Sequence, residues 1–201
     1  MTASVRLWFG ALAALIFAAG VWALASKIPG YSHVHQTISE IGEAGTPLQR
    51  PFTVLLLVVA FCMLVFASGV FSVSKTAGRS TFAAWLLVCM AASAAGVGIF
   101  STPHPLHNVF GLSELVGYQA PAAVALTWRR EPRAGGLVAF SWLMFVLLWV
   151  SMGLNLAGLA PDSDLWKHIK PVYGLAQRAL FGSFFLWCAA AGPMLARLAR
   201  G

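Results

Sequence analysis

Six long apolar runs take up almost the whole of this 201-residue chain, and they constrain its fold more than any other feature. A helix needs about 20 mostly apolar residues to cross the hydrocarbon core of a bilayer. The composition agrees with this reading: 59% of the residues are hydrophobic, only 9% are charged, and the mean hydropathy is +0.80. We therefore expect an all-α polytopic membrane bundle of six transmembrane helices, forming one integral membrane domain over residues 1–201. The predicted spans are about 7–26, 52–73, 81–100, 108–128, 137–160 and 173–195.

The basic residues indicate which way the spans face. When the segments are assigned alternately to the two sides, the side of both termini carries Arg6, Lys75, Arg79, Arg129, Arg130, Arg133, Arg197 and Arg200. The opposite side carries Lys27, Arg50, Lys167 and Lys170. Because Lys and Arg are enriched in short cytoplasmic loops, this pattern predicts that the N- and C-termini lie inside.

The charge distribution argues against a nucleic-acid partner, and the cysteines argue against redox and metal sites. The net charge is +7, but the basic residues do not form a patch with interleaved aromatic side chains, so we expect no nucleic-acid partner. Cys62, Cys89 and Cys188 all fall within predicted spans without a CxxC spacing. We interpret them as buried small apolar residues rather than as redox or metal sites.

The longest connection, residues 27–51, is expected to be ordered. Thr37 and Glu40 have the spacing of a capping box that opens a short helix. Thr46-Pro47-Leu48-Gln49 is a second helix-start pattern, so the second span should begin before its apolar run, with Arg50 in its first turns.

Three other patterns predict local structure. Pro121 should kink the fourth span. The small side chains of residues 91–98 should let a neighbouring helix approach closely. Asp162 and Asp164 precede a stretch around Trp166 that is typical of a short interfacial helix.

Polar chemistry gathers on the predicted outer side, which holds all five histidines and five of the six acidic residues. Glu114 and Arg178 lie about one turn or more inside apolar spans, where an unpaired charge is costly. If their helices are neighbours, an ion pair between the two would keep both charged, either as part of a site or as a structural salt bridge. The candidate outer-face pocket comprises Tyr31, His33, His35, Ser39, Glu40, His104, His107, Glu114 and Arg178.

The histidine spacings match no strong metal motif. His104 and His107 are three residues apart, but the prolines around them oppose a regular helix, and His33 and His35 would need an extended geometry to share an ion. His107 and Glu114 are two helical turns apart and therefore share one face with a rise of about 10 Å. We predict no cofactor and no bound metal, with Zn²⁺ as the alternative, and no haem because the histidines lie at or beyond the span ends.

Nucleophilic catalysis requires a serine beside a histidine, with a third group to orient the histidine. Along the chain, Ser39 could be paired with His35, or Ser101 with His104. Such pairs are common in any loop, so both remain alternatives.

Pro29-Gly30-Tyr31-Ser32 and Ile38-Ser39-Glu40-Ile41-Gly42, which follow the first span, resemble the signature of an uncharacterised prokaryotic membrane family, domain of unknown function 998. The six-span layout and Gly182-Ser183-Phe184-Phe185 in the last span extend the resemblance over essentially the whole chain. The resemblance implies a helical bundle in a bacterial or archaeal cytoplasmic (inner) membrane and supplies no settled activity or catalytic residue. A likeness to zinc-dependent ceramidase-like membrane hydrolases is weaker, because the last span has no histidine.

Three functional classes remain open. The first is a protein that binds membrane lipids or another amphiphilic small molecule through the polar outer pocket. The second is a membrane-embedded lipid hydrolase or transferase that uses His and Glu for acid-base chemistry or binds a metal. The third is a small transporter, which would usually have charges and broken helices near the bilayer midplane.

Overall fold

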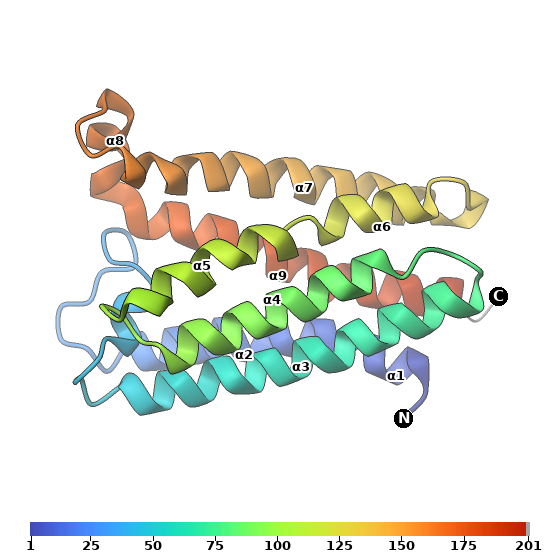
Figure 1. The fold of residues 1–201 in the computed structure, drawn as a ribbon, viewed down its shortest axis with the longest axis horizontal. Coiled ribbons are helices and arrows are strands. Elements are labelled where there is room, and N and C mark those ends of the chain that lie inside the picture. The colour runs from blue at the N-terminus through green and yellow to red at the C-terminus, as the bar shows by residue number, and fades with distance from the viewer. Residues whose placement is uncertain (200–201) are drawn as a thin grey trace.

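The computed structural model describes residues 1–199 and contains six helical stretches that are long and apolar enough to cross a membrane, as predicted (Figure 1). They run up and down along one long axis, and both ends of the chain lie at the same end of the bundle. We call this the terminal end. The six stretches are Ala3–Ala25, Gln49–Thr76, Phe82–Ile99, Pro105–Trp128, Pro132–Leu159 and Asp164–Leu198.

Two of these stretches are interrupted by turn residues. The first consists of α1 (Ala3–Leu7) and α2 (Phe9–Ala25), and the fourth consists of α5 (Pro105–Gly117) and α6 (Ala120–Trp128). The remaining long helices are α3 (Gln49–Thr76), α4 (Phe82–Ile99), α7 (Gly135–Leu156) and α9 (Tyr173–Leu198). Short elements are η1 (Ser39–Gly42), η2 (Pro132–Ala134), η3 (Ala157–Leu159), α8 (Asp164–Ile169) and η4 (Lys170–Val172).

The break in the fourth span confirms the expected effect of Pro121, which lies at the start of α6. Proline has no N–H to continue the helix, so a carbonyl in the preceding turn loses its partner. The Gln119 side chain compensates nearby, because its Nε2 donates to the Leu115 carbonyl at 2.9 Å. The span therefore changes direction between Gly117 and Ala120 without leaving the Leu115 carbonyl unpaired.

Helices that follow one another in the chain mostly pack together, but the two halves of the fourth span pack on different helices. The α2 helix packs on α3 and α9, α3 on α4, and α4 on α5, while α7 packs on both α6 and α9. The α5 helix thus belongs to the α3/α4 side of the bundle, whereas α6 joins α7. In Figure 1, α5 and α7 diverge from the break toward the end of the bundle opposite the termini.

Small residues set the closest helix contacts. A Cβ atom at Gly96 would overlap the Phe110 ring of α5, so the small-residue run 91–98 does allow the predicted close approach. At the other side of the bundle, a Cβ at Gly10 would lie 2.5 Å from the Cys188 carbonyl oxygen of α9. That neighbour is backbone and cannot rotate away.

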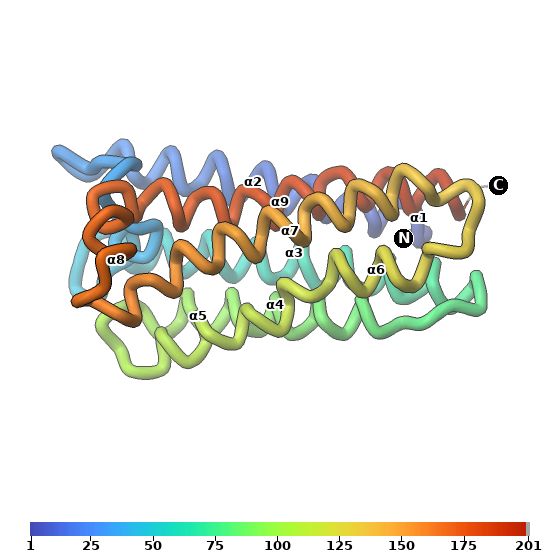
Figure 2. Tube along the Cα trace, turned by 90° about the horizontal axis from the view of Figure 1, so that it is seen from above, coloured from blue at the N-terminus to red at the C-terminus, as the bar shows by residue number. Residues whose placement is uncertain are grey.

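The end of the bundle opposite the termini is formed by residues 26–48, 100–104 and 157–172, and we call it the histidine end (Figure 2). The predicted short helix is present as α8, where the Ser163 hydroxyl accepts a hydrogen bond from the Trp166 N–H at 3.1 Å. The α3 helix begins at Gln49 with Arg50 in its first turn, as expected, although Thr46 lies two residues before the actual cap.

One prediction about the core was wrong. Cys62 and Cys188 are buried free thiols, but Cys89 is exposed on the surface of α4. An apolar span gives no periodic signal that separates its lipid-facing side from its buried side, which is why the sequence did not reveal this.

Candidate functional site

Arg178 ties the first loop to the last helix. Its Nη1 donates to the Gln36 and Gly174 carbonyls at 2.7 and 2.9 Å, and its Nη2 donates to the Tyr31 hydroxyl at 2.7 Å. The Tyr31 hydroxyl in turn donates to the Thr37 carbonyl at 2.7 Å. Burial raises the pKa of Tyr31, although the hydrogen bond and the charge of Arg178 oppose this shift.

Glu40 completes this network from the η1 side. Its carboxylate accepts from the backbone N–H and the hydroxyl of Thr37, both at 2.9 Å, and from the Gln36 side chain at 3.2 Å. Half of the predicted capping box is formed, because Glu40 accepts from the Thr37 N–H. The Thr37 hydroxyl donates to Glu40 instead of capping η1, whose N-cap residue is Ile38. Tyr31, Glu40 and Arg178, three of the candidate residues, belong to one connected network that holds residues 31–40 on α9.

Four of the five histidines have separate local roles. His33 stacks on Trp22 with ring centroids 4.8 Å apart, and partial burial, followed by the charge of Arg178, lowers its pKa. His35 Nδ1 contacts the Pro171 carbonyl, and His104 Nδ1 accepts from the Leu106 N–H at the start of α5. His168 Nδ1 contacts the Asp164 carbonyl at 2.7 Å within α8. Among residues 1–199, no group of three His, Cys, Asp or Glu side chains is arranged to hold a metal ion.

His107 contacts a serine that is distant in sequence. Its Nε2 lies 3.2 Å from the Ser39 hydroxyl of η1, and its Nδ1 lies 2.9 Å from the Phe100 carbonyl at the end of α4. Neither of the sequence pairings is formed. Ser39 contacts His107 rather than His35, and the buried Ser101 hydroxyl has no hydrogen-bond partner among the described residues.

Glu114 and Arg178 do not form the expected ion pair. Glu114 is only 7% exposed, and its carboxyl accepts a 2.8 Å hydrogen bond from the hydroxyl of Tyr118, the residue that follows α5. Arg178 instead uses the loop carbonyls and Tyr31. The reason is the helix packing. Because α5 packs on α4 rather than on α9, Glu114 and Arg178 form their hydrogen bonds with different segments of the chain.

Glu114 and His107 line one groove between α5, α7 and α9, as their seven-residue spacing predicts. The groove has a volume of about 410 Å³. Its polar lining residues are His107, Asn108, Glu114, Asn155, Tyr173 and Gln177. Its apolar lining includes Val97, Leu112, Met152, Leu156, Leu159, Leu180 and Phe181.

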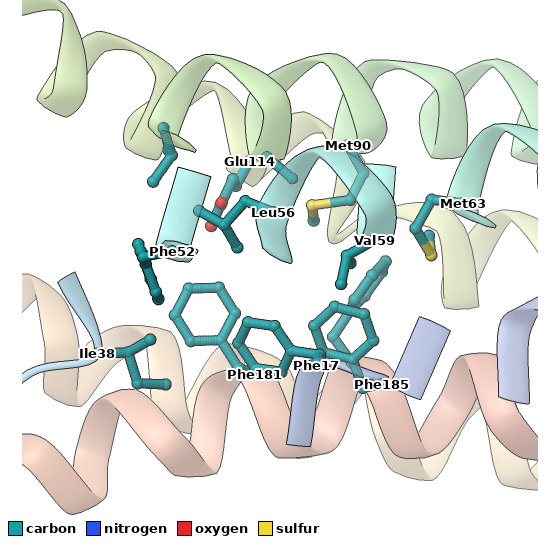
Figure 3. A pocket seen from close by; sticks show the side chains of 13 residues that line it. Phe17, Ile38, Phe52, Leu56, Val59, Met63, Met90, Glu114, Phe181 and Phe185 are labelled. Atoms are coloured by element: carbon teal, nitrogen blue, oxygen red, sulfur yellow. The ribbon is translucent and has the colours of Figure 1, made fainter. Parts of the chain in front are cut away.

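Arg178 and His33 line a different groove, between α2 and α9, with a volume of about 360 Å³. Phe181 lines both grooves, and its ring also lies in the small internal cavity of Figure 3, opposite Glu114. That cavity measures about 30 Å³, and its other labelled lining side chains are apolar. These four candidate residues are thus divided between two sides of α9, while Tyr31 and Glu40 line a third pocket of about 530 Å³ formed by residues 27–48.

Several residues of this region gave no signal in the sequence. Tyr118, the partner of Glu114, lies in an apolar span and could be found only from its i, i+4 spacing. Gln177 Oε1 accepts from the Ile38 N–H at 2.5 Å, and Asn155 Nδ2 donates to the Ala176 carbonyl at 3.0 Å. Both hydrogen bonds depend on which segments are neighbours in the fold. The spacing of residues along the chain does not reveal this.

Comparison with known protein families gives one match, to the family described as "Protein of unknown function (DUF998)", over residues 11–193. The chain belongs to this family. The match covers all six spans, from within α2 to within α9, so the grooves on both sides of α9 lie inside the DUF998 region. No curated protein and no solved structure matches the chain.

Proposed function

We propose that this DUF998 protein binds a membrane amphiphile in the groove between α5, α7 and α9. The single observation that carries the proposal is the mixed lining of that groove, which combines apolar side chains such as Leu112, Leu156 and Leu180 with polar side chains such as His107, Asn108 and Gln177. A molecule with a hydrocarbon chain and a polar headgroup has the same two kinds of surface. Small-molecule sites combine apolar walls with a few polar groups in this way and have volumes of about 300–1,000 Å³.

The position of the groove supports a ligand that comes from the bilayer. It lies where α5 and α7 diverge, in the half of the bundle that leads to the histidine end (Figure 1). Its walls belong to spans whose outer surfaces face lipid. An acyl chain could therefore enter sideways without losing contact with an apolar environment, and its headgroup would remain near the histidine end.

The charged groups favour a particular headgroup chemistry. Among residues 1–199, no lysine or arginine lines this groove, and its acidic side chain is Glu114. The side-chain oxygen of Asn155, which is a hydrogen-bond acceptor, suits a headgroup that carries hydroxyl or amino groups. An anionic headgroup would instead favour the groove between α2 and α9, where Arg178 lies.

Glycine substitutions allow a direct test. Gly111 lines the α5/α7/α9 groove, and a Cβ atom there would meet no other atom within 4 Å, so Gly111→Phe should fill the groove without disturbing helix packing. Gly182 has the same open surroundings and lines the α2/α9 groove. Gly153 on α7 is equally open but lines neither groove, so Gly153→Phe is the control. Native mass spectrometry of the purified protein would measure the lipid that remains bound.

We expect Gly111→Phe to lose most of the retained lipid, while Gly153→Phe keeps it. A loss confined to Gly182→Phe would move the ligand to the Arg178 groove, and retention that is equal in all three variants would refute binding in either groove.

Transport is a second candidate function, favoured by the break at residues 118–119, one helical turn after Glu114. Secondary transporters often have discontinuous helices and ionisable residues at their binding sites. Reconstitution into vesicles with a fluorescent lipid would separate the two functions. A transporter should speed lipid movement between leaflets and should be slowed by Gly111→Phe, whereas a binding protein should leave the rate at that of protein-free vesicles.

A further inference from the structure

Ser39 and His107 are 68 residues apart in sequence and meet at the histidine end through the 3.2 Å contact between Oγ and Nε2. The other ring nitrogen, Nδ1, lies 2.9 Å from the Phe100 carbonyl oxygen. A carbonyl can only accept a hydrogen bond, so Nδ1 must carry the ring proton. When Nε2 carries no proton, its lone pair faces Ser39 and the Ser39 hydroxyl is the donor.

We propose that Ser39 is a nucleophile and His107 its general base, and that together they hydrolyse an acyl ester. The proposal rests on the proposed function, because the α5/α7/α9 groove would hold the acyl chain of the ester. It also adds a reaction to what would otherwise be a binding site.

The arrangement has the three roles that serine hydrolysis requires: a hydroxyl, an imidazole that accepts its proton, and a group that fixes the imidazole tautomer. The Phe100 carbonyl takes the third role, which a carboxylate often has. Phe100 is well placed for it, because its N–H bonds to the Gly96 carbonyl at 2.9 Å and its ring stacks on Phe110 at 5.5 Å. The imidazole is therefore held between the ends of α4 and α5.

The location of the pair also fits an ester substrate. His107 lies in the first turn of α5 and lines the groove, and Ser39 and His107 are both partly exposed. Membrane esters have their carbonyl groups between the polar headgroups and the hydrocarbon core, which is the depth at which a span begins. A chain that extends from His107 toward Glu114 would pass the apolar side chains of Leu112 and Leu180.

In the first step, Ser39 Oγ forms a bond to the acyl carbon while its proton moves to His107 Nε2. The bond between the acyl carbon and the alcohol oxygen then breaks, and the imidazolium returns the proton to the departing alcohol. A water molecule repeats the sequence on the acyl-serine. His107 takes one water proton while the water oxygen bonds to the acyl carbon; the bond between the acyl carbon and Ser39 Oγ then breaks, and Oγ recovers the proton from His107. The net reaction converts one ester and one water into a carboxylic acid and an alcohol.

An alkyl fluorophosphonate tests the pair directly, because an activated serine displaces fluoride and forms a stable phosphorus–oxygen bond. We expect the full-length protein in detergent micelles to be labelled on Ser39, as located by peptide mass spectrometry. His107→Gln should slow labelling by about 100-fold, since general-base catalysis contributes on the order of 10²–10⁴ in rate. Ser101→Ala, which removes a nearby buried hydroxyl without a hydrogen bond, should be labelled at the wild-type rate.

Labelling of wild-type protein on another serine, or no labelling above that of heat-denatured protein, would refute the nucleophile assignment. Because the labelled peptide is read from wild-type protein, this result does not depend on whether a variant folds. Lipid retention that is still lost in Gly111→Phe would then show that binding stands without hydrolysis. Labelling of Ser39 with no retained lipid would show that the nucleophile assignment stands and that the proposed lipid binding fails.

Discussion

The Arg178 guanidinium of α9 donates a 2.7 Å hydrogen bond to the Tyr31 hydroxyl, and the Arg178 carbon Cζ lies 5.7 Å from the centre of the Tyr31 ring. These two residues are 147 positions apart, so their contact fixes the first loop to the last span. Arg178 forms no ion pair among the described residues. Its charge is instead solvated by carbonyl oxygens and by a phenol, an arrangement that anchors a loop at the edge of a membrane span.

Tyr31→Phe should destabilise the protein by about 1.5–3 kcal/mol, because hydrogen bonds to charged groups contribute about this much. Thermal or denaturant unfolding in mixed micelles would measure the loss. A double-mutant cycle with Arg178→Met should give a coupling energy above about 0.5 kcal/mol. Additive effects of the two substitutions would mean that the contact contributes nothing to stability.

Tyr118→Phe should destabilise the protein by about 1–3 kcal/mol, because it removes the hydrogen bond to a buried carboxyl. Tyr173→Phe is a matched control, since the Tyr173 hydroxyl lies 3.5 Å from the Asn155 carbonyl and loses only a weak contact. Glu114→Gln keeps an acceptor for Tyr118 and should stay close to wild type. Unfolding measurements on the three variants would decide this, and equal losses for the two tyrosines would count against a special role for Tyr118.

Protein stability should decrease as the pH falls below the ordinary His33 pKa of 6.5. Burial against Trp22 and the charge of Arg178 lower the pKa of folded His33, so the unfolded chain binds the proton first and is favoured in this window. The contribution is complete above pH 6.5 and is lost as the pH falls through the lower folded-state pKa. Thermal midpoints between about pH 5 and pH 8 should vary less in His33→Gln. An unchanged dependence in that variant would assign the effect to other groups.

Gly10→Ala should destabilise the protein by more than about 1 kcal/mol, because the new methyl group would meet the Cys188 carbonyl of α9. Gly153→Ala should instead be neutral or stabilising by about 0.5–1 kcal/mol, since it replaces a helical glycine in open surroundings. Both variants can be compared by thermal unfolding in the same detergent. A tolerated Gly10→Ala would mean that α2 and α9 can separate without cost.

The orientation predicted from the basic loops can be tested by labelling with a membrane-impermeant maleimide. Asp162 is exposed at the histidine end and Arg130 is exposed at the terminal end, so each can be replaced by a cysteine as a label site. If both termini are cytoplasmic, intact cells should label Asp162→Cys, while Arg130→Cys should react only after lysis. The reverse pattern would place the histidine end in the cytoplasm.

The sequence alone determined the six spans, the break near Pro121, the short helix α8 and the Glu40 half of the Thr37–Glu40 capping box. Each of these depends on residues within about four positions of one another or on the length of an apolar run, and such local signals survive without knowledge of the fold. The shared face of His107 and Glu114 follows from helical periodicity for the same reason.

Only the tertiary structure decided which polar groups meet. It separated Glu114 from Arg178, because α5 packs on α4 while Arg178 faces the first loop, and it paired Ser39 with His107 rather than with His35. It also determined the groove. The groove exists because the fourth span is broken, so that α5 packs on α4 while α6 packs on α7. In spans that are apolar on every face, the sequence carries little information about which helix lies beside which. Close packing of small and large side chains makes that choice.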